Sequence, residues 1–204
     1  MSMQPFTIVS GKAAPMLAAN IDTDVIMPKQ FLKGIDRNGL DRGLFFDLRF
    51  LPSGEPNPAF ILNQPGWQDA RFLVTGPNFG CGSSREHAVW GLKQLGIRAL
   101  IGSSFAGIFY DNCQRNGVLV ISLEEAQVQT LGHTVSQAET AEITVDLSAQ
   151  CIQVADGSSL PFQIDGLRKT ALLQGLDAIG STLQRSPQIR EFQERHLEAN
   201  PWLN

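Results

Sequence analysis

Between residues 71 and 122 the chain alternates short apolar segments with longer segments of helical periodicity. These segments are, in order, 71–75, 84–95, 97–101, 104–115 and 118–121. The first, third and fifth have the length of buried strands, and the other two repeat apolar residues every three or four positions. Strands that alternate with helices of this length form βαβ units, whose strands lie parallel in one sheet. The sequence therefore predicts an α/β fold with a parallel βαβαβ core.

After residue 141 the pattern changes, and apolar and polar residues alternate. The apolar positions are 143, 145, 147, 152, 154, 160, 162 and 164. This period of two is typical of strands, and Asp156-Gly157 is a hairpin turn signal. Helical segments follow at 165–174 and 186–199, and Pro187 suits the first position of the second. We therefore expect an antiparallel hairpin and C-terminal helices beside the parallel core.

The first third of the chain is less regular. Its pattern predicts short strands at 6–10 and 25–28 and a helical turn around 30–32. Residues 34–65 are rich in Gly, Pro and Asn, which favour loops. Long loops in a compact domain are often functional, and we expect this loop to be mobile in the isolated chain.

Length and charge limit the class of protein. A chain of 204 residues suits one domain, which we expect to span residues 1–204. A net charge of −4 and a pI of about 5.3 argue against a nucleic-acid surface. Neither a signal peptide nor a bilayer-spanning apolar stretch is recognisable, so we expect a cytoplasmic protein without a membrane partner. Three widely separated cysteines, at 81, 113 and 151, indicate neither a disulfide framework nor a zinc site.

The junction between the first predicted strand and helix of the core carries a Gly-rich turn, two hydroxyls and an arginine. Its sequence from residue 80 is Gly-Cys-Gly-Ser83-Ser84-Arg85. Glycines let the backbone approach a ligand, a helix start carries partial positive charge, and arginine can grip a carboxylate with two hydrogen bonds. These properties favour a site for a carboxylate or phosphate. The alternative is a capping box, in which Ser83 and Glu86 only cap the helix.

Three further stretches carry candidate polar residues. Gly102-Ser103-Ser104 repeats the first turn at the next strand end, where open α/β sheets bind ligands, although it also suits a plain helix cap. Asp22-Thr23-Asp24 could bind a cation or orient a catalytic group, or form an ordinary Asx turn. Arg49 lies among aromatic residues, where a charge needs an anion; Asp47 is its simplest partner.

Several motifs together resemble the small subunits of 3-isopropylmalate dehydratase, a family of the aconitase superfamily. They lie at 20–32, 44–50, 78–87, 104–109 and 175–183, and they cover nearly the whole length. The resemblance implies a swivelling β/β/α domain like the C-terminal domain of aconitase. It also implies a large-subunit partner that supplies a [4Fe-4S] cluster, with no cofactor or metal held by this chain.

The implied reaction is the second step of leucine biosynthesis. In it, 2-isopropylmalate is dehydrated to 2-isopropylmaleate and rehydrated to 3-isopropylmalate, with iron on the partner taking the hydroxyl. By resemblance, Ser83 is the catalytic base, and the substrate-binding residues are Ser84, Arg85, Arg49, Asp24 and Thr23. Phe31, Leu32 and Lys33 match the family's specificity loop, and the apolar pair suits an isopropyl group better than a third carboxylate.

Two other functions stay open at this point. The first is the same chemistry on a related acid such as methylmalate or homoaconitate. The second is a non-catalytic anion-binding module, which would keep its role if Ser83 lost its hydroxyl. Cys81 stands where aconitases commonly carry Glu, and this favours the isopropylmalate branch of the superfamily.

Overall fold

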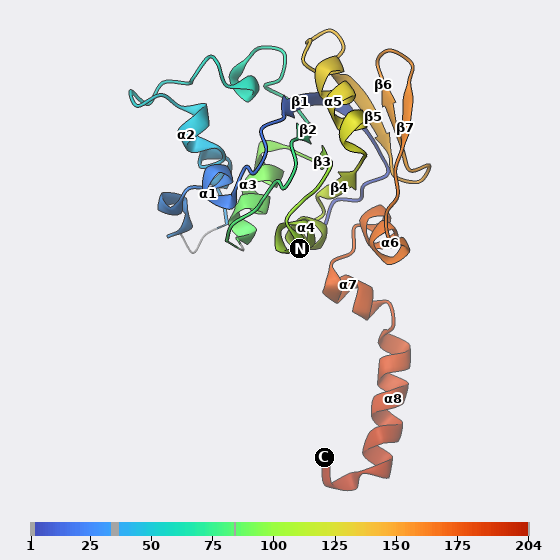
Figure 1. Ribbon diagram of the computed structural model, residues 1–204. Helices are drawn as coiled ribbons and strands as arrows, with labels where there is room; N and C mark the ends of the chain where they lie inside the picture. Colours follow the sequence, from blue (N-terminus) through green and yellow to red (C-terminus); the bar gives the residue numbers. More distant parts are fainter. Residues whose placement is uncertain (1–2, 34–36, 84, 204) are drawn as a thin grey trace.

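The structure is a computed structural model that describes residues 3–33, 37–83 and 85–203 (Figure 1). One seven-stranded sheet with the order β4-β3-β2-β1-β5-β6-β7 forms its centre. The strands are β1 (Ile8–Met16), β2 (Phe72–Thr75), β3 (Ala99–Gly102), β4 (Leu119–Ser122), β5 (Glu142–Asp146), β6 (Cys151–Val154) and β7 (Ser159–Pro161). β1 to β4 are parallel, and β5 to β7 extend the sheet from β1 as antiparallel strands. The predicted parallel core and antiparallel hairpin are therefore confirmed.

Burial explains why the two halves of the sheet have different sequence patterns. Every residue of β2 and β3 is buried, and all of them except Thr75 are apolar or glycine, as in parallel sheets that are covered on both faces. In β5 and β6 buried residues alternate with more exposed ones, which gives the period of two. β1 joins the halves, pairing with β2 through Ala13 to Met16 and with β5 through Ile8 to Lys12.

The helices are α1 (Thr23–Ile26), α2 (Phe46–Arg49), α3 (Glu86–Leu95), α4 (Gly107–Arg115), α5 (Glu125–Thr134), α6 (Gly166–Gln174), α7 (Ala178–Leu183) and α8 (Ser186–Ala199). Helices α1 to α5 lie in the connections between strands, and α6 to α8 follow the last strand. Figure 1 shows α3 and α4 beside each other on one side of the strands, with α5 across the strands from them. The sequence prediction missed α5, although a capping box of Glu124 and Gln127 marks its start.

Two elements predicted in the first third of the chain differ from the structure. The prediction of a strand at 25–28 is wrong, because Thr23–Ile26 forms α1. The side chain of Asp22 caps the start of this helix, and its Oδ1 accepts a hydrogen bond from the Val25 N–H (2.8 Å). Local capping thus outweighs the β preference of Val25 and Ile26. β1 also runs to Met16 instead of ending at residue 10, because both of its edges are paired.

The described part of the predicted loop, residues 37–65, contains α2 and two 3₁₀ helices, Leu40–Arg42 and Ile61–Asn63. It also places several apolar side chains in the core: Leu40, Leu44, Phe45, Phe60 and Leu62. Gln94 of α3 holds this segment, since its Oε1 accepts from the Leu40 N–H (2.7 Å). The Gly and Pro residues of this segment therefore separate short helices and turns. The mobility of the segment stays a prediction.

Residues 178–203, which we call the C-terminal arm, leave the body of the protein. The arm comprises α7, α8 and the 3₁₀ helix Pro201–Leu203, and none of its residues is buried. Figure 1 shows α8 extending away from the sheet to the C-terminus. The bounds of α8 agree with the predicted helix at 186–199. Within the described ranges, no helix is long and apolar enough to cross a membrane.

Candidate active site

The Gly-rich turn after β2 rests on the segment that precedes α1. The Gly80 N–H donates to the Ile21 carbonyl oxygen (2.8 Å), and the Thr23 N–H donates to the Cys81 carbonyl oxygen (2.8 Å). A third contact joins the starts of the two segments, where Asn78 Nδ2 donates to Asn20 Oδ1 (2.8 Å). Two segments about 60 residues apart are therefore joined by hydrogen bonds at the carboxyl edge of the sheet.

Gly80 is required by this packing. Its φ is 77°, in the left-handed region that favours glycine, and a Cβ at this position would lie 2.2 Å from Cγ of Phe109. Phe109 is itself buried and stacks edge-on against Phe79, with ring centroids 5.6 Å apart. The first glycine of the turn thus lets the chain pass over the start of α4.

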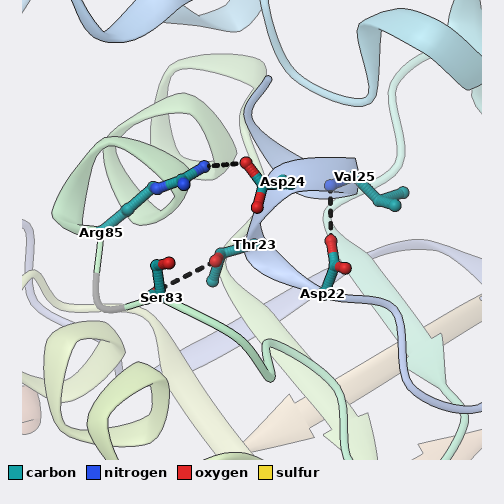
Figure 2. Close-up of polar contacts among 6 residues, drawn as sticks. All are labelled: Asp22, Thr23, Asp24, Val25, Ser83 and Arg85. Carbon is teal, nitrogen blue, oxygen red and sulfur yellow. Dashed lines mark hydrogen bonds and ion pairs between the residues drawn. The ribbon is translucent and has the colours of Figure 1, made fainter. Parts of the chain in front are cut away.

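Ser83 follows this turn as an exposed residue whose backbone is held in place (Figure 2). Thr23 Oγ1 donates a hydrogen bond to the Ser83 carbonyl oxygen (2.8 Å). Thr23 is only 1% exposed, so its hydroxyl serves the turn and does not face solvent. The structure therefore fixes the main chain at Ser83 while the residue itself stays accessible.

Arg85 forms an ion pair with Asp24, with Nη1 and Oδ1 2.5 Å apart (Figure 2). The Arg85 side chain is 13% exposed and that of Asp24 is 44% exposed. The hydrogen bond from Arg85 lowers the pKa of Asp24 below its ordinary value, against a smaller opposing effect of desolvation. Asp24 is therefore ionised near neutral pH and holds the guanidinium of Arg85, which lies two residues along the chain from Ser83.

The capping-box interpretation of this turn is not supported. α3 begins at Glu86, so Arg85 occupies the N-cap position, two residues after Ser83, and it makes no side-chain cap hydrogen bond. Glu86 Oε1 instead accepts from Asn116 Nδ2 (3.4 Å). Glu86 is thus tied to the end of α4, and Ser83 does not stand where a capping serine would.

Asn116 is a residue of the site region that the sequence interpretation missed. Its Oδ1 accepts from Trp90 Nε1 (3.0 Å), while its Nδ2 reaches Glu86. Trp90 also contacts His87, with ring centroids 4.8 Å apart, and Arg37, whose guanidinium carbon is 4.2 Å from the indole centroid. No local pattern marks Asn116, because its partners lie 26 and 30 residues earlier.

The second Gly-Ser-Ser turn lies directly beside the first. Ser104 Oγ accepts from the Asn78 N–H (2.9 Å), and Phe79 and Phe105 form a parallel bridge. These contacts explain why α4 begins at Gly107 and not at Ser104: residues 104–106 extend along the first turn instead. Ser104 therefore supports the first turn instead of capping a helix.

The remaining predicted residues lie on the segments around α2. Arg49 Nη1 donates to the Asp41 carbonyl oxygen (2.8 Å), so its partner is not Asp47, the simplest candidate from the sequence. Phe31 packs against Phe46, with ring centroids 5.0 Å apart, and over Gly43. Leu32 is half-buried and Lys33 is exposed. Ser84 lies outside the described residues.

Metal-binding groups are sparse in this region. In the parts of the chain that the structure describes, no group of three or more His, Cys, Asp and Glu side chains could hold a metal ion. Burial raises the pKa of the Cys113 thiol well above its ordinary value, so this cysteine is a poor ligand at neutral pH. The side chains in the described ranges therefore do not form a ligand set that fits an iron–sulfur cluster.

Comparison with known families gives matches along almost the whole sequence. Residues 3–126 match the aconitase C-terminal domain, and residues 129–166 match the family model LeuD_N. Residues 179–204 match the C-terminal domain of the 3-isopropylmalate dehydratase small subunit. Two relatives named as 3-isopropylmalate dehydratase small subunits, from Mannheimia succiniciproducens and Salmonella typhimurium, are 61% and 59% identical. Each alignment covers 98% of this chain, with 99% and 96% of the respective relative.

A solved structure supports the same assignment. It is the 3-isopropylmalate dehydratase LeuD of Methanocaldococcus jannaschii, which is 26% identical and superposes with a TM-score of 0.67. The match covers 91% of this chain and 99% of that one. The predicted aconitase-type fold is therefore confirmed, and the chain belongs to the family of 3-isopropylmalate dehydratase small subunits in the aconitase superfamily.

Proposed function

We propose that this chain is the small subunit of a hydro-lyase that interconverts 2-isopropylmalate and 3-isopropylmalate through 2-isopropylmaleate, in the second step of leucine biosynthesis. The observation that carries the proposal is the placement of Ser83. It is exposed on a turn whose backbone is fixed by Thr23, and it lies two residues from an arginine fixed by Asp24. The reaction is inferred from family membership, and the roles of Ser83, Arg85, Thr23 and Asp24 are inferred from this geometry.

The reaction needs a base for a carbon-bound proton and cations for two carboxylates. Dehydration removes a proton from the carbon beside the one that carries the hydroxyl, at a position α to a carboxylate. We assign the proton transfer to Ser83 Oγ, which takes this proton as an alkoxide and returns it to the neighbouring carbon during rehydration. A serine needs electrostatic help in this role, and the nearby Arg85 and the start of α3 provide positive potential.

Arg85 is assigned to a substrate carboxylate. A guanidinium has five N–H donors, and its ion pair with Asp24 leaves donors for a second partner. Asp24 was predicted to bind substrate directly, but a carboxylate repels the carboxylates of the substrate. We therefore assign Asp24 to orient Arg85 and Thr23 to hold the backbone of Ser83.

The side chain of the substrate is assigned to the segment before residue 34. Phe31 and Leu32 are apolar and half-buried, and Phe31 is backed by Phe46. Such a surface favours an isopropyl group over a third carboxylate, because burying an unpaired charge is costly. Ser84 and Arg49 stay proposed substrate contacts on the strength of the family motif.

The proposal assigns the [4Fe-4S] cluster to the large subunit. A cluster bound there would act as the Lewis acid for the departing hydroxyl. This chain would then be active only in a complex with that partner, in the cytoplasm.

The direct test is Ser83→Ala in the complex. The chain and the large subunit of the same organism are co-expressed and purified without oxygen, and dehydration of 2-isopropylmalate is measured. Losing a general base typically costs about 100- to 10,000-fold in rate, so we expect a loss of that size with assembly unchanged. Ser122→Ala is the matched control, since Ser122 is an exposed serine at the carboxyl end of β4, and its activity is expected to stay within about twofold of wild type.

Two results would contradict the proposal. Unchanged activity of Ser83→Ala in a complex with an intact cluster would leave a non-catalytic anion-binding role. A higher kcat/KM for methylmalate or homoaconitate than for 2-isopropylmalate would assign the same chemistry to another acid.

A further inference from the structure

The C-terminal arm and the body surface beside it concentrate the exposed large apolar side chains of this protein. Of the eleven such residues in the described ranges, seven follow residue 166. They are Leu167, Ile179, Leu183, Ile189, Phe192, Trp202 and Leu203, and they are between 45% and 82% exposed. Exposed apolar patches that continue over several elements mark interaction surfaces.

α8 is amphipathic, and its apolar face has no partner within the described chain. Ile189 and Phe192 are three residues apart, and His196 stacks on Phe192 with ring centroids 5.6 Å apart, so the three share one face. The charged residues Arg190, Glu191, Glu194, Arg195 and Glu198 lie around the rest of the helix. A helix of 14 residues is marginally stable alone in water. This helix therefore needs a surface to cover its apolar face.

A groove of about 440 Å³ lies at the base of the arm, between α4, α6 and α7. Its lining is mixed, since Leu167 and Leu176 are apolar while Asp111, Arg115 and Asp177 are charged. Gln114 also lines it, and both polar atoms of its amide are buried without a hydrogen-bond partner among the described residues. Because these amide atoms are buried, they are not presented to the groove, and its mixed apolar and charged lining is what a protein partner would contact.

We propose that the C-terminal arm and this groove form a docking surface for the large subunit. This inference rests on the proposed function, because membership of a small-subunit family requires such a partner. The polar face of α8 carries three Glu and two Arg, whereas helices that bind membrane surfaces are rich in Lys and Arg. Pairing of two copies as a coiled coil is disfavoured, since such seams run over about three heptads or more and α8 has 14 residues.

The test compares two faces of α8 in the full-length protein. Ile189→Gln with Phe192→Gln removes the apolar face, and Glu194→Gln with Glu198→Gln changes the opposite face while keeping helix propensity similar. The dissociation constant of each variant for the purified large subunit is measured by titration without oxygen, and activity is then measured at saturation. We expect the apolar-face variant to bind about tenfold or more weaker, with kcat restored at saturation, and the control to bind within roughly twofold of wild type.

The measurement of affinity does not depend on activity, so it separates this inference from the proposed function. If the wild-type complex is inactive but its assembly still requires the apolar face, the proposed function is contradicted and the docking surface is supported. Equal affinity of both variants, or no binding by wild type, would overturn the docking surface. The docking surface would also be contradicted if the apolar-face variant bound the large subunit normally and lost only self-association in sedimentation, or only binding to vesicles of anionic phospholipid.

Discussion

The turn that carries Ser83 and the C-terminal arm are supported in opposite ways. Thr23, Asp24 and Gly80 fix the turn through contacts with distant parts of the chain, and Thr23 is almost fully buried. The arm has no buried residue and leaves apolar side chains in solvent. Chemistry needs atoms held in place by the protein itself, whereas a docking surface can gain its order when the partner arrives.

The largest effect is expected where the turn is most tightly packed. Gly80→Ala places a Cβ within 2.2 Å of Phe109 at a positive φ. Left-handed strain costs roughly 1–2 kcal/mol, and overpacking adds roughly 1–3 kcal/mol. Gly39→Ala is the control, because Gly39 has a φ of 74° but open space around it, so only the strain applies. Urea unfolding of the isolated protein measures both, and equal losses would show that Phe109 adjusts freely.

A smaller effect is expected from the ion pair beside Ser83. Asp24→Asn keeps an acceptor for Arg85 but removes the charge that holds it, and we expect kcat/KM of the complex to fall about tenfold, or about 1.4 kcal/mol. Asp22→Asn is the control, since Asn also caps helix starts well and α1 should be unchanged. A larger loss in the control would place the important carboxylate at Asp22.

The pKa of Asp24 sets the pH range in which this pair acts. Because Arg85 lowers that pKa below 3.8, the stabilisation is complete above this value and is lost as the pH falls through the lowered pKa. The pH profiles of wild type and Asp24→Asn should therefore be parallel from about pH 6 to 9. An activity step in this range that disappears in Asp24→Asn would contradict the assignment.

The smallest effect is expected from removing most of the arm. Truncation after residue 183 deletes α8, and none of the described residues that it removes is buried, so the Tm of the isolated protein should change by less than about 2 °C. Leu172→Ala is the contrast within α6, where Leu172 is 2% exposed, and should cost about 2–4 kcal/mol. A drop of several degrees on truncation would show that the arm packs on the body.

The agreement between sequence and structure follows how local each signal is. The strands β2 to β4 were predictable because their burial produces short apolar runs in the sequence. The bounds of α8 were predictable because a Pro marks its start and apolar residues recur at helical spacing. Each of these signals lies within a few residues of the element. α5 was missed and α1 was mistaken for a strand, because in both cases the deciding signal was a cap of one or two side chains. The stretch from 80 to 87 was recognisable from its motif, but the motif also fitted a capping box.

Sequence by itself determined the parallel core, the antiparallel extension and the family, because periodicity and motifs are properties of neighbouring residues. Tertiary structure alone decided that Thr23 holds Ser83 and that Asp24 holds Arg85, across 60 and 61 residues of chain. It alone also showed that the apolar face of α8 has no cover within the described residues. Such contacts depend on the path of the whole chain, and a local pattern cannot specify that path.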